Sequence, residues 1–563
     1  MMHLNTVVAT MMYTAATAVA AAPASLPMLF MTAADVRSPR GLQYPVATPA
    51  VDMTATLCAP AAPLCNVTTL AMRNLVQGGL MAPNPLRPEA GYELFYVDDV
   101  GVDDVGGGVE GLFYLTTVDF LAFTAPVQVA TLRVPNAAAI RACIVKSMAR
   151  SDDGARYLAM AICGSDVGFR PMAAAFPLRA DRPFTPLNAT PAFWDHDDAN
   201  VAYDASSGRF VDLQITFESQ RHPKEYCDNV GLARCAEGYR RVVTLRAAAD
   251  AAGLAWSDDA ACPGERWDPE HTKRFDPQFR TCARGWNASG MVVPDADDPP
   301  ELEFYKLAPM RVGATRRVVG HALLYAPAPD ASLGSHAYPP GIPCGNLTRG
   351  CHGPHVGVAR WVGPSDGALT RLPLAAAWAR PFRRQGYAGR RHRLAPNVGE
   401  LFTVGGPLFR DHHVWVSRTA VPGPPARDAA LLGVPAYRLA GMFAPANAQF
   451  STPAFAVPNA TGAAAAPRLW LNADASWERP PAGARHGCDI GCGAYVMVEA
   501  RDAASGRVIA GFEKERCVFL DADGVRLALA WNGTSTAALR GRSVALRVYF
   551  RDAVVYAVGL EEE

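Results

Sequence analysis

The sequence has no excess of charge of either sign, because its 53 lysines and arginines balance its 53 aspartates and glutamates. A protein that binds nucleic acid through the phosphates needs a net basic face that releases counterions, so this balance argues against a nucleic-acid binder. Charged residues are also scarce, at 19% of the chain, whereas 50% of the residues are hydrophobic. Such a chain can bury a large core, which excludes intrinsic disorder as its main state.

Long apolar runs are absent beyond the N-terminal segment, and a membrane-spanning helix needs about twenty apolar residues. Residues 1–25 are themselves apolar, contain no acidic residue and end in a run of small residues. This segment resembles a secretory signal peptide, although its first part lacks lysine and arginine. We therefore expect residues 1–24 to be a signal peptide, and the protein to be secreted or to enter the secretory-pathway lumen without a membrane span.

Glycosylation sequons independently favour that route. Asn-x-Ser/Thr occurs more often than chance would place it among so few asparagines, and each occurrence lies in a turn-like context. The sequons begin at Asn66, Asn188, Asn287, Asn346, Asn459 and Asn532. We expect all of them to be glycosylation sites.

Cysteines also fit an oxidising compartment. Several form close pairs inside polar segments rich in proline and glycine, which is typical of disulfides that pin loops. These pairs are Cys58/Cys65, Cys227/Cys235, Cys262/Cys282 and Cys344/Cys351. Cys143 and Cys163 are candidates to join neighbouring strands, and Cys488 and Cys492 are candidates for a further local pair. Because the total of 13 is odd, one thiol stays unpaired or pairs between chains, and Cys517 is the candidate.

Glycine and proline, with 48 and 46 residues, are spread along the chain and predict many turns between short strands. Between residues 90 and 445 one phrase recurs about five times: a short strand, a turn with Asp and Gly, and a second strand. The expected strands are 92–96 with 111–115, 156–162, 210–217 with 241–245, 321–325 with 356–361, and 400–404 with 413–417. Repeated strand pairs of this kind are typical of a β-propeller.

From residue 447 the pattern changes to regular alternating strands, which indicates an antiparallel β-sandwich. Its expected strands are 469–473, 494–499, 508–512, 525–531 and 544–550. The predicted fold is therefore all-β, with a five-bladed β-propeller over residues 25–446 followed by a C-terminal antiparallel β-sandwich over residues 447–563.

Three phrases carry a resemblance to a known group of proteins. They are the segment that begins Asp195-His-Asp-Asp-Ala-Asn200, the segment Asp298-Pro-Pro-Glu-Leu-Glu303-Phe-Tyr305, and the ending from Leu539 to Tyr556. Together they resemble a largely uncharacterised group of secreted proteins similar to the five-bladed propellers of glycoside hydrolase families 32 and 43 with a C-terminal β-sandwich. The resemblance covers most of residues 90–563 and implies a carbohydrate substrate bound in the propeller's axial funnel.

Glycoside hydrolysis needs one carboxylate that attacks or activates water and one carboxylic acid that protonates the leaving oxygen. Asp197 and Asp198 begin the third unit and Glu303 begins the fourth, each before an apolar strand. The resemblance implies that a blade-start Asp stabilises the transition state and that a Glu one blade away is the general acid. We therefore assign Asp198 as stabiliser or base and Glu303 as acid, with Glu301 as the competing acid on the same strand face.

Further residues are expected to contact the substrate. They are Asp197, Asn200, Glu301, Tyr305, Asp411 and His412. Trp194, Tyr305 and Trp415 are candidates for the apolar platform on which a sugar ring stacks, or for fillers between blades. In the alternative interpretation, Asp197 and Asp198 cap a turn and Glu303 is an edge charge.

The first unit departs from the family pattern. Relatives of invertase place their nucleophile there in an Asn/Asp-Pro-type phrase, whereas the corresponding region of this chain holds only Asp35. Either Asp35 keeps that role or the catalytic set is incomplete. A non-catalytic extracellular glycan-binding or recognition protein is therefore the alternative function.

Other motifs are weaker. Ser365 fits Gly-x-Ser-x-Gly but lacks the strand-to-helix context of a serine hydrolase. The acidic run 98–104 lacks the spacing of a calcium loop, and Cys351-His-Gly-Pro-His355 has Cys344 as a simpler partner than zinc. We therefore expect no metal or other cofactor. The arginines of 380–393 form either a solvated loop or a contact for acidic glycans.

Overall fold

The computed structural model describes a set of ranges that covers most of the expected strands. These are residues 27–30, 35–47, 51–52, 75–102, 108–120, 122–134, 143–163, 168–194, 199–205, 207–219, 239–256, 281–282, 303–311, 318–326, 351–361, 369–371, 404–409, 412–417, 430–438, 440–444, 446–459, 467–475, 494–520 and 522–561. They form β-sheets joined by turns and a few short 3-10 helices, which confirms the all-β class. Within these ranges no helix has the length and apolar character to cross a membrane.

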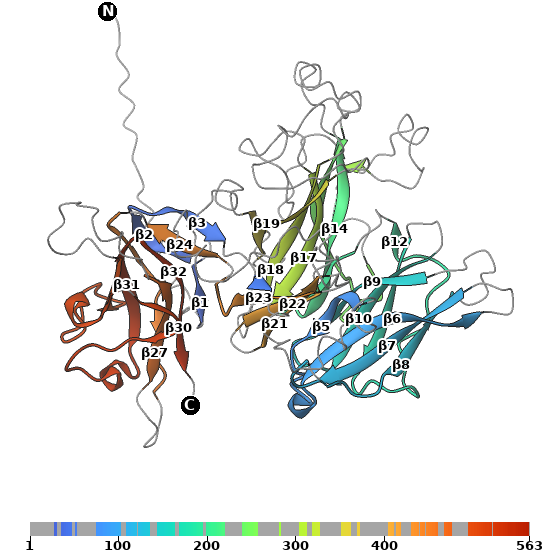
Figure 1. Cartoon of the computed structure of the whole chain (residues 1–563), viewed down its shortest axis with the longest axis horizontal. Coiled ribbons are helices and arrows are strands. Elements are labelled where there is room, and N and C mark those ends of the chain that lie inside the picture. The colour runs from blue at the N-terminus through green and yellow to red at the C-terminus, as the bar shows by residue number, and fades with distance from the viewer. Residues whose placement is uncertain are drawn as a thin grey trace, which may run out of the picture.

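Two of the sheets pack as a sandwich (Figure 1). The first has the order β3 (Gln43–Ala47), β24 (Ala440–Ala444), β32 (Ala553–Glu561), β27 (Arg468–Asp474) and β30 (Asp523–Ala528), and β1 (Met28–Leu29) pairs with β32. The second has the order β2 (Arg37–Arg40), β25 (Ala448–Ser451), β31 (Ser543–Arg551), β28 (Tyr495–Asp502) and β29 (Val518–Leu520), and β26 (Phe455–Ala456) pairs with β31.

Alternating side chains build the core of this sandwich. Along β31, Val544, Leu546, Val548 and Phe550 are fully buried, and the residues between them point outward. This is the period of two that a half-buried strand requires. The indole Nε1 of the buried Trp531 donates to the Val498 carbonyl at 2.9 Å, so its polar atom is satisfied inside the core.

The N-terminal strands belong to the sandwich, which corrects the predicted boundary at residue 447. β1 pairs with β32, β2 with β25, and β3 with β24. The sandwich therefore begins with residues near Met28 and resumes at Ala440. Asp35, considered above as a nucleophile, is buried two positions before β2. The strand predicted at 508–512 is also wrong, because only Val508 bridges Arg501 and a turn follows.

The remaining strands form sheets whose members follow one another along the chain. The first group is β5 (Leu75–Met81), β6 (Tyr92–Val102), β7 (Gly108–Thr117) and β8 (Val127–Leu132). The second group is β9 (Cys143–Arg150), β10 (Arg156–Cys163), β11 (Gly168–Ala175) and β12 (Phe193–Trp194). A parallel pairing of Gln77 with Ser147 joins these two groups into one sheet. Gly78, at φ +71°, permits this approach, because a Cβ there would clash with the Met148 carbonyl oxygen.

Three further sheets complete this part of the molecule. They are β13 (Val201–Asp204), β14 (Arg209–Ser219), β15 (Tyr239–Ala247) and β16 (Thr281–Cys282); β17 (Glu303–Arg311), β18 (Val318–Ala326), β19 (Cys351–Trp361) and β20 (Leu369–Arg371); and β21 (Val404–Phe409), β22 (His412–Ser417), β23 (Ala430–Pro435) and β4 (Val51–Asp52). The N-terminal strand β4 thus completes the last sheet by pairing with β23.

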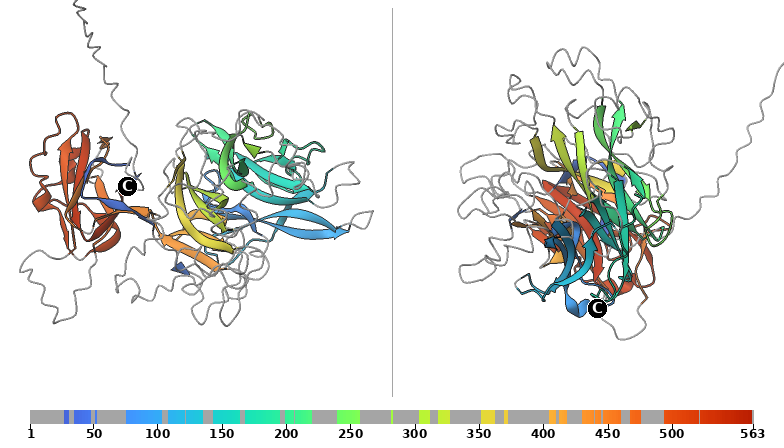
Figure 2. Two further views of the ribbon diagram at one scale, coloured as in Figure 1. Left: turned by 90° about the horizontal axis from the view of Figure 1, so that it is seen from above. Right: turned by 90° about the vertical axis from the view of Figure 1, so that its right-hand side faces the viewer.

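The first strands of these groups are neighbours in cyclic order. β5 contacts β9, β9 contacts β13, β13 contacts β17, β17 contacts β21, and β21 contacts β5. Figure 2 shows these sheets grouped together beside the sandwich. We call this set of first strands the inner ring. The ring brings together segments that are far apart in the sequence.

Candidate functional site

The inner ring has two distinguishable ends. We call the end at which a first strand turns into its second strand the hairpin end, and the other the opening end. The Tyr92 hydroxyl donates to the Leu408 carbonyl at 2.5 Å, which places the turn after β5 beside the end of β21. Arg156 Nη2 donates to the Tyr203 hydroxyl at 2.9 Å, which places the turn after β9 beside the end of β13. Together with the parallel pairing of β5 and β9, these contacts give β21, β5, β9 and β13 one direction.

The candidate catalytic carboxylates fall at first-strand starts. Asp197 and Asp198 lie outside the described residues, immediately before Ala199 and the opening end of β13. Glu303 is the first residue of β17, and its backbone pairs with that of Tyr325. β13 and β17 contact each other in the inner ring. Glu301 lies outside the described residues.

Asn200, predicted to contact substrate, is fully buried at the start of β13. Its Nδ2 donates to the Leu213 carbonyl at 2.7 Å, and its backbone N–H donates to Asp212 Oδ1 at 2.6 Å. These contacts give Asn200 a role in holding β13 against β14. They also fix the backbone two positions after Asp198 in the sequence.

Asp212 and Arg246 are buried charged residues that the sequence patterns above did not single out. Asp212 is 0% and Arg246 1% exposed, and their Cα atoms are partners across β14 and β15. The Arg246 guanidinium lies 4.4 Å from the centre of the Phe193 ring. The sequence signal that could have found Asp212 is an aspartate within the apolar strand 210–217, because a charged side chain is buried only where it is hydrogen-bonded or ion-paired. Asp212 is a positioning residue for the opening end of β13.

We expect Asp212→Ala to lower the free energy of unfolding by about 1.5–3 kcal/mol, because the Asn200 N–H loses its charged acceptor. Asp212→Asn keeps an acceptor oxygen at the same position and is the matched control. We expect it to lose less of the free energy of unfolding. Urea denaturation of both variants measures the difference. Equal losses would mean that the bond to Asn200 does not matter.

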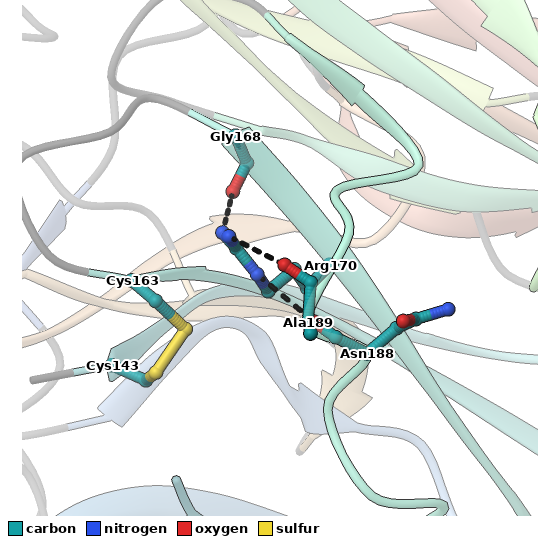
Figure 3. The surroundings of a disulfide bond; sticks show 6 residues. All are labelled: Cys143, Cys163, Gly168, Arg170, Asn188 and Ala189. Atoms are coloured by element: carbon teal, nitrogen blue, oxygen red, sulfur yellow. Dashed lines mark hydrogen bonds between the residues drawn. A yellow bond between two sulfur atoms is a disulfide. The ribbon is translucent and has the colours of Figure 1, made fainter. Parts of the chain in front are cut away.

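The disulfide between Cys143 and Cys163 confirms the expected link between neighbouring strands. It joins the first residue of β9 to the last of β10, whose backbones are paired (Figure 3). Beside it, the fully buried Arg170 donates to three carbonyl oxygens, those of Gly168 at 2.8 Å, Asn188 at 3.0 Å and Ala189 at 3.3 Å. These bonds hold the opening end of the second group in place.

Cys143→Ser/Cys163→Ser is expected to destabilise the protein by about 3 kcal/mol, because the bond closes a chain separation of 20 residues. Denaturant unfolding with and without a reducing agent measures this effect. In the double variant, a reducing agent should no longer lower the free energy of unfolding through this disulfide. An unchanged free energy of unfolding would contradict the prediction.

His412 lies away from the opening end. It is the half-buried first residue of β22 and has Phe409, the last residue of β21, as its backbone partner, which places it at the hairpin end of β21. Asp411 is outside the described residues. Tyr305 lies at the register shift between Phe304 and Lys306 of β17. The structure therefore does not place His412 with Asn200.

A buried ionic cluster also lies at the hairpin end. The Glu93 carboxylate is 0% exposed, forms an ion pair with Arg150, and accepts from the Tyr157 hydroxyl at 2.9 Å and from Asn84 Nδ2 at 3.2 Å. Burial and the nearby Glu93 charge raise the pKa values of Tyr157 and Tyr114 above the ordinary range. With its carboxylate fully paired and excluded from solvent, this cluster joins β6, β9 and β10 and is not a substrate site.

The other predicted residues are described in part. Asn188, Asn459 and Asn532 are exposed, as glycosylation requires, and the remaining sequons lie outside the described residues. The same holds for Cys58, Cys65, Cys227, Cys235, Cys262 and Cys344, while Cys282 and Cys351 are described only as strand backbone. Cys517 is a buried free thiol, as expected, and burial raises its pKa to about 12. No cluster of three or more His, Cys, Asp or Glu side chains in the described ranges could hold a metal ion.

Comparisons with known proteins find neither a family model nor a curated protein that matches this chain. Solved structures show weak likenesses. A complex of BT0996 with RGII has a TM-score of 0.33 at 10% identity and covers 71% of this chain and 92% of its own. A putative glycoside hydrolase from Parabacteroides distasonis has a TM-score of 0.31 at 11% identity, with 70% and 96% covered.

A third likeness is to the catalytic domain of the Coprinopsis cinerea GH62 α-L-arabinofuranosidase, with a TM-score of 0.21, 11% identity, and 53% and 95% covered. The structural neighbours therefore include glycoside hydrolases at low identity. TM-scores this low do not establish a shared family. The function proposed below rests on the chain's own residues.

Proposed function

We propose that the five strand groups outside the sandwich are the blades of a five-bladed β-propeller, and that the protein binds and hydrolyses a carbohydrate at the opening end of its inner ring. One observation carries this proposal. The first strands contact one another in cyclic order, so β13, which follows Asp198, is the neighbour of β17, which begins with Glu303. Two acids about a hundred positions apart thereby become candidates for one site.

In this site Asp198 stabilises the developing positive charge on the sugar or activates water, and Glu303 protonates the leaving oxygen. A general acid must hold its proton near neutral pH, and a second carboxylate close by raises its pKa by repulsion. Asp197 and Tyr305 contact the sugar. Asn200 and Asp212 act beneath them by fixing the backbone at the start of β13.

His412 lies outside this proposed site, because it is at the hairpin end of β21. The role of the neighbouring Asp411 stays a prediction. Glu301 remains the competing acid, since it precedes Glu303 by two positions and a strand places such residues on one face. A comparison of Glu301→Gln with Glu303→Gln separates the two candidates. The variant that loses activity identifies the acid.

A panel of polysaccharides assayed for release of reducing sugar tests the proposed activity. The wild-type chain is expected to release sugar from at least one member. Binding to the same panel is measured in parallel. Binding without release of sugar from any member would overturn the proposed hydrolase activity. It would favour the alternative, a glycan-recognition protein that uses the same opening end.

We also propose that the chain is a secreted glycoprotein. The composition of residues 1–24 and the exposed positions of Asn188, Asn459 and Asn532 support this. We expect the protein from a secreting eukaryotic host to lose mass on treatment with an N-glycosidase. Asn459→Gln/Asn532→Gln should reduce that loss by two glycans, whereas no loss from the wild type would contradict the proposal.

A further inference from the structure

The outer face of the second sandwich sheet carries rows of arginine and tyrosine. Arg37 pairs with Ser451, which pairs with Arg547 on the next strand. Arg40 pairs in the same way with Gln449, which pairs with Tyr549. Directly paired residues share one face of a sheet, and the alternate residues of β31 are in the core, so these side chains point outward.

Tyrosine rings hold several of these cations. The Arg551 guanidinium lies 5.4 Å from the centre of the Tyr495 ring, and the Arg547 guanidinium lies 5.5 Å from that of Tyr549. Lys514 Nζ lies 4.4 Å from the same Tyr549 ring. Such cation–π contacts orient the side chains without neutralising their charge. The cations are thus partly ordered before any ligand binds.

Carboxylates are few among the described residues of these rows. Glu499, the cross-strand neighbour of Arg547, is bonded to Arg501 Nε at 2.6 Å and accepts from the Tyr549 hydroxyl at 2.9 Å. Glu515 lies 3.9 Å from Lys514 Nζ. Among the described residues, no acceptor meets Arg547 Nε. We call the outward set Arg37, Arg40, Arg547, Arg551 and Lys514 the arginine face. Because the whole chain has a formal net charge of zero, this excess is local.

The opposite outer face of the sandwich is already occupied. Trp470 of β27 stacks on Tyr437 with ring centres 5.6 Å apart, and Arg438 Nε donates to Asn472 Oδ1 at 2.7 Å. Tyr437 and Arg438 belong to the segment that leads from β23 into the sandwich. The sheet with β2 and β31 is the one turned away from the other sheets (Figure 1). The arginine face therefore lies on the side of the sandwich away from the other sheets.

We propose that the arginine face binds an acidic polysaccharide, a polymer that carries carboxylate or sulfate groups. Guanidinium groups bind such oxyanions through two parallel hydrogen bonds. Along β31, Arg547 and Arg551 are four residues apart, which is about 13 Å in a strand, and Arg37 lies two strands from Arg547, about 10 Å away. An extended polymer with repeated anions can contact several of these positions at once, whereas a single small anion cannot.

A membrane surface fits this face less well. Peripheral membrane segments combine basic residues with apolar side chains that enter the bilayer. Here Arg547 and Arg551 are half-buried beside tyrosine rings whose hydroxyls are bonded to Glu499 and Asn447. The exposed Leu520 lies on the edge strand β29, at the margin of the rows. The test includes vesicles for this reason.

The binding of the full chain to polygalacturonate, dextran sulfate and neutral dextran tests the proposal. We expect the wild type to bind at least one acidic polymer and not dextran. Arg547→Gln/Arg551→Gln should weaken that binding about tenfold or more, since two charge-assisted contacts are lost. The matched control is Arg179→Gln/Arg182→Gln, which removes the same charge from an exposed loop elsewhere and should change affinity less than about twofold.

A second variant protects the test against misfolding. Arg37→Gln/Arg40→Gln changes only exposed side chains of β2, and it should weaken binding in the same direction. Equal weakening by the loop control, equal binding of neutral dextran, or binding to phosphatidylserine vesicles but to neither acidic polymer would each overturn the proposal. These outcomes are independent of whether Glu303 is catalytic, because the measurement is of binding at the sandwich.

Discussion

Glu303→Gln is expected to reduce glycoside hydrolysis by about 10²–10⁴-fold, the contribution of a positioned general acid. Glutamine has the same shape as glutamate but cannot donate a proton to the leaving oxygen. The start of β17 is a strand backbone paired with β18, so the substitution leaves the local fold intact. Initial rates of reducing-sugar release measure the loss, with the substrate that the wild type cleaves best.

The control for this variant is Glu89→Gln. Glu89 is an exposed residue of the 3-10 helix Pro88–Ala90, on the segment between β5 and β6. Its replacement should leave the rate unchanged, and substrate binding by Glu303→Gln should persist. Equal rates for Glu303→Gln and the wild type would exclude Glu303 as the acid.

Glu93→Gln is expected to lower the free energy of unfolding by about 3–5 kcal/mol, because it removes one partner of a buried ion pair. Arg150, which is 10% exposed at its side chain, would keep its charge next to a neutral amide. The Tyr157 hydroxyl and Asn84 Nδ2 would also lose a charged acceptor. Urea denaturation of the full chain measures the change.

The exposed Glu89→Gln again supplies the control, with an expected change within about 0.5 kcal/mol. Because the Glu93 cluster is at the hairpin end, we expect Glu93→Gln to keep the sugar-releasing rate per folded molecule. A loss below about 1 kcal/mol would contradict the role of Glu93 as a paired buried charge.

Local patterns predicted those strands whose partners are near in sequence. The pairing of 92–96 with 111–115 and of 210–217 with 241–245 is confirmed by the registers of β6 with β7 and of β14 with β15. The same is true of 321–325 with 356–361. In each case an alternating or apolar run is followed by a turn and a second such run, which is sufficient for an antiparallel pair.

Strands with distant partners had no such signal. β2 reads Arg-Ser-Pro-Arg and is exposed throughout, so its pairing with β25 depends on a neighbour about four hundred residues away. β4 has only the two residues Val51–Asp52 and is defined by the edge of β23. Tertiary contacts alone make these segments strands, and the predicted start of the sandwich was wrong for that reason.

The candidate acids were selected by residue type, whereas the residues that support them were not. Asp198 and Glu303 were selected because acids that directly precede apolar strands of different units can converge on one site. Asp212 and Glu93 were not selected, because an acid within an apolar strand shows its role only when its bonded partners are known. For Asp212 that partner is the backbone of Asn200.

The distance between the carboxyl carbons of Asp198 and Glu303 in a crystal structure of the full chain tests the central claim most directly. The proposed site requires both groups to face one cavity at the opening end of the inner ring, about 5–10 Å apart, the span that glycosidases use. Carboxyl groups that point to opposite ends of the ring would contradict the account and leave the sheets without a hydrolytic centre.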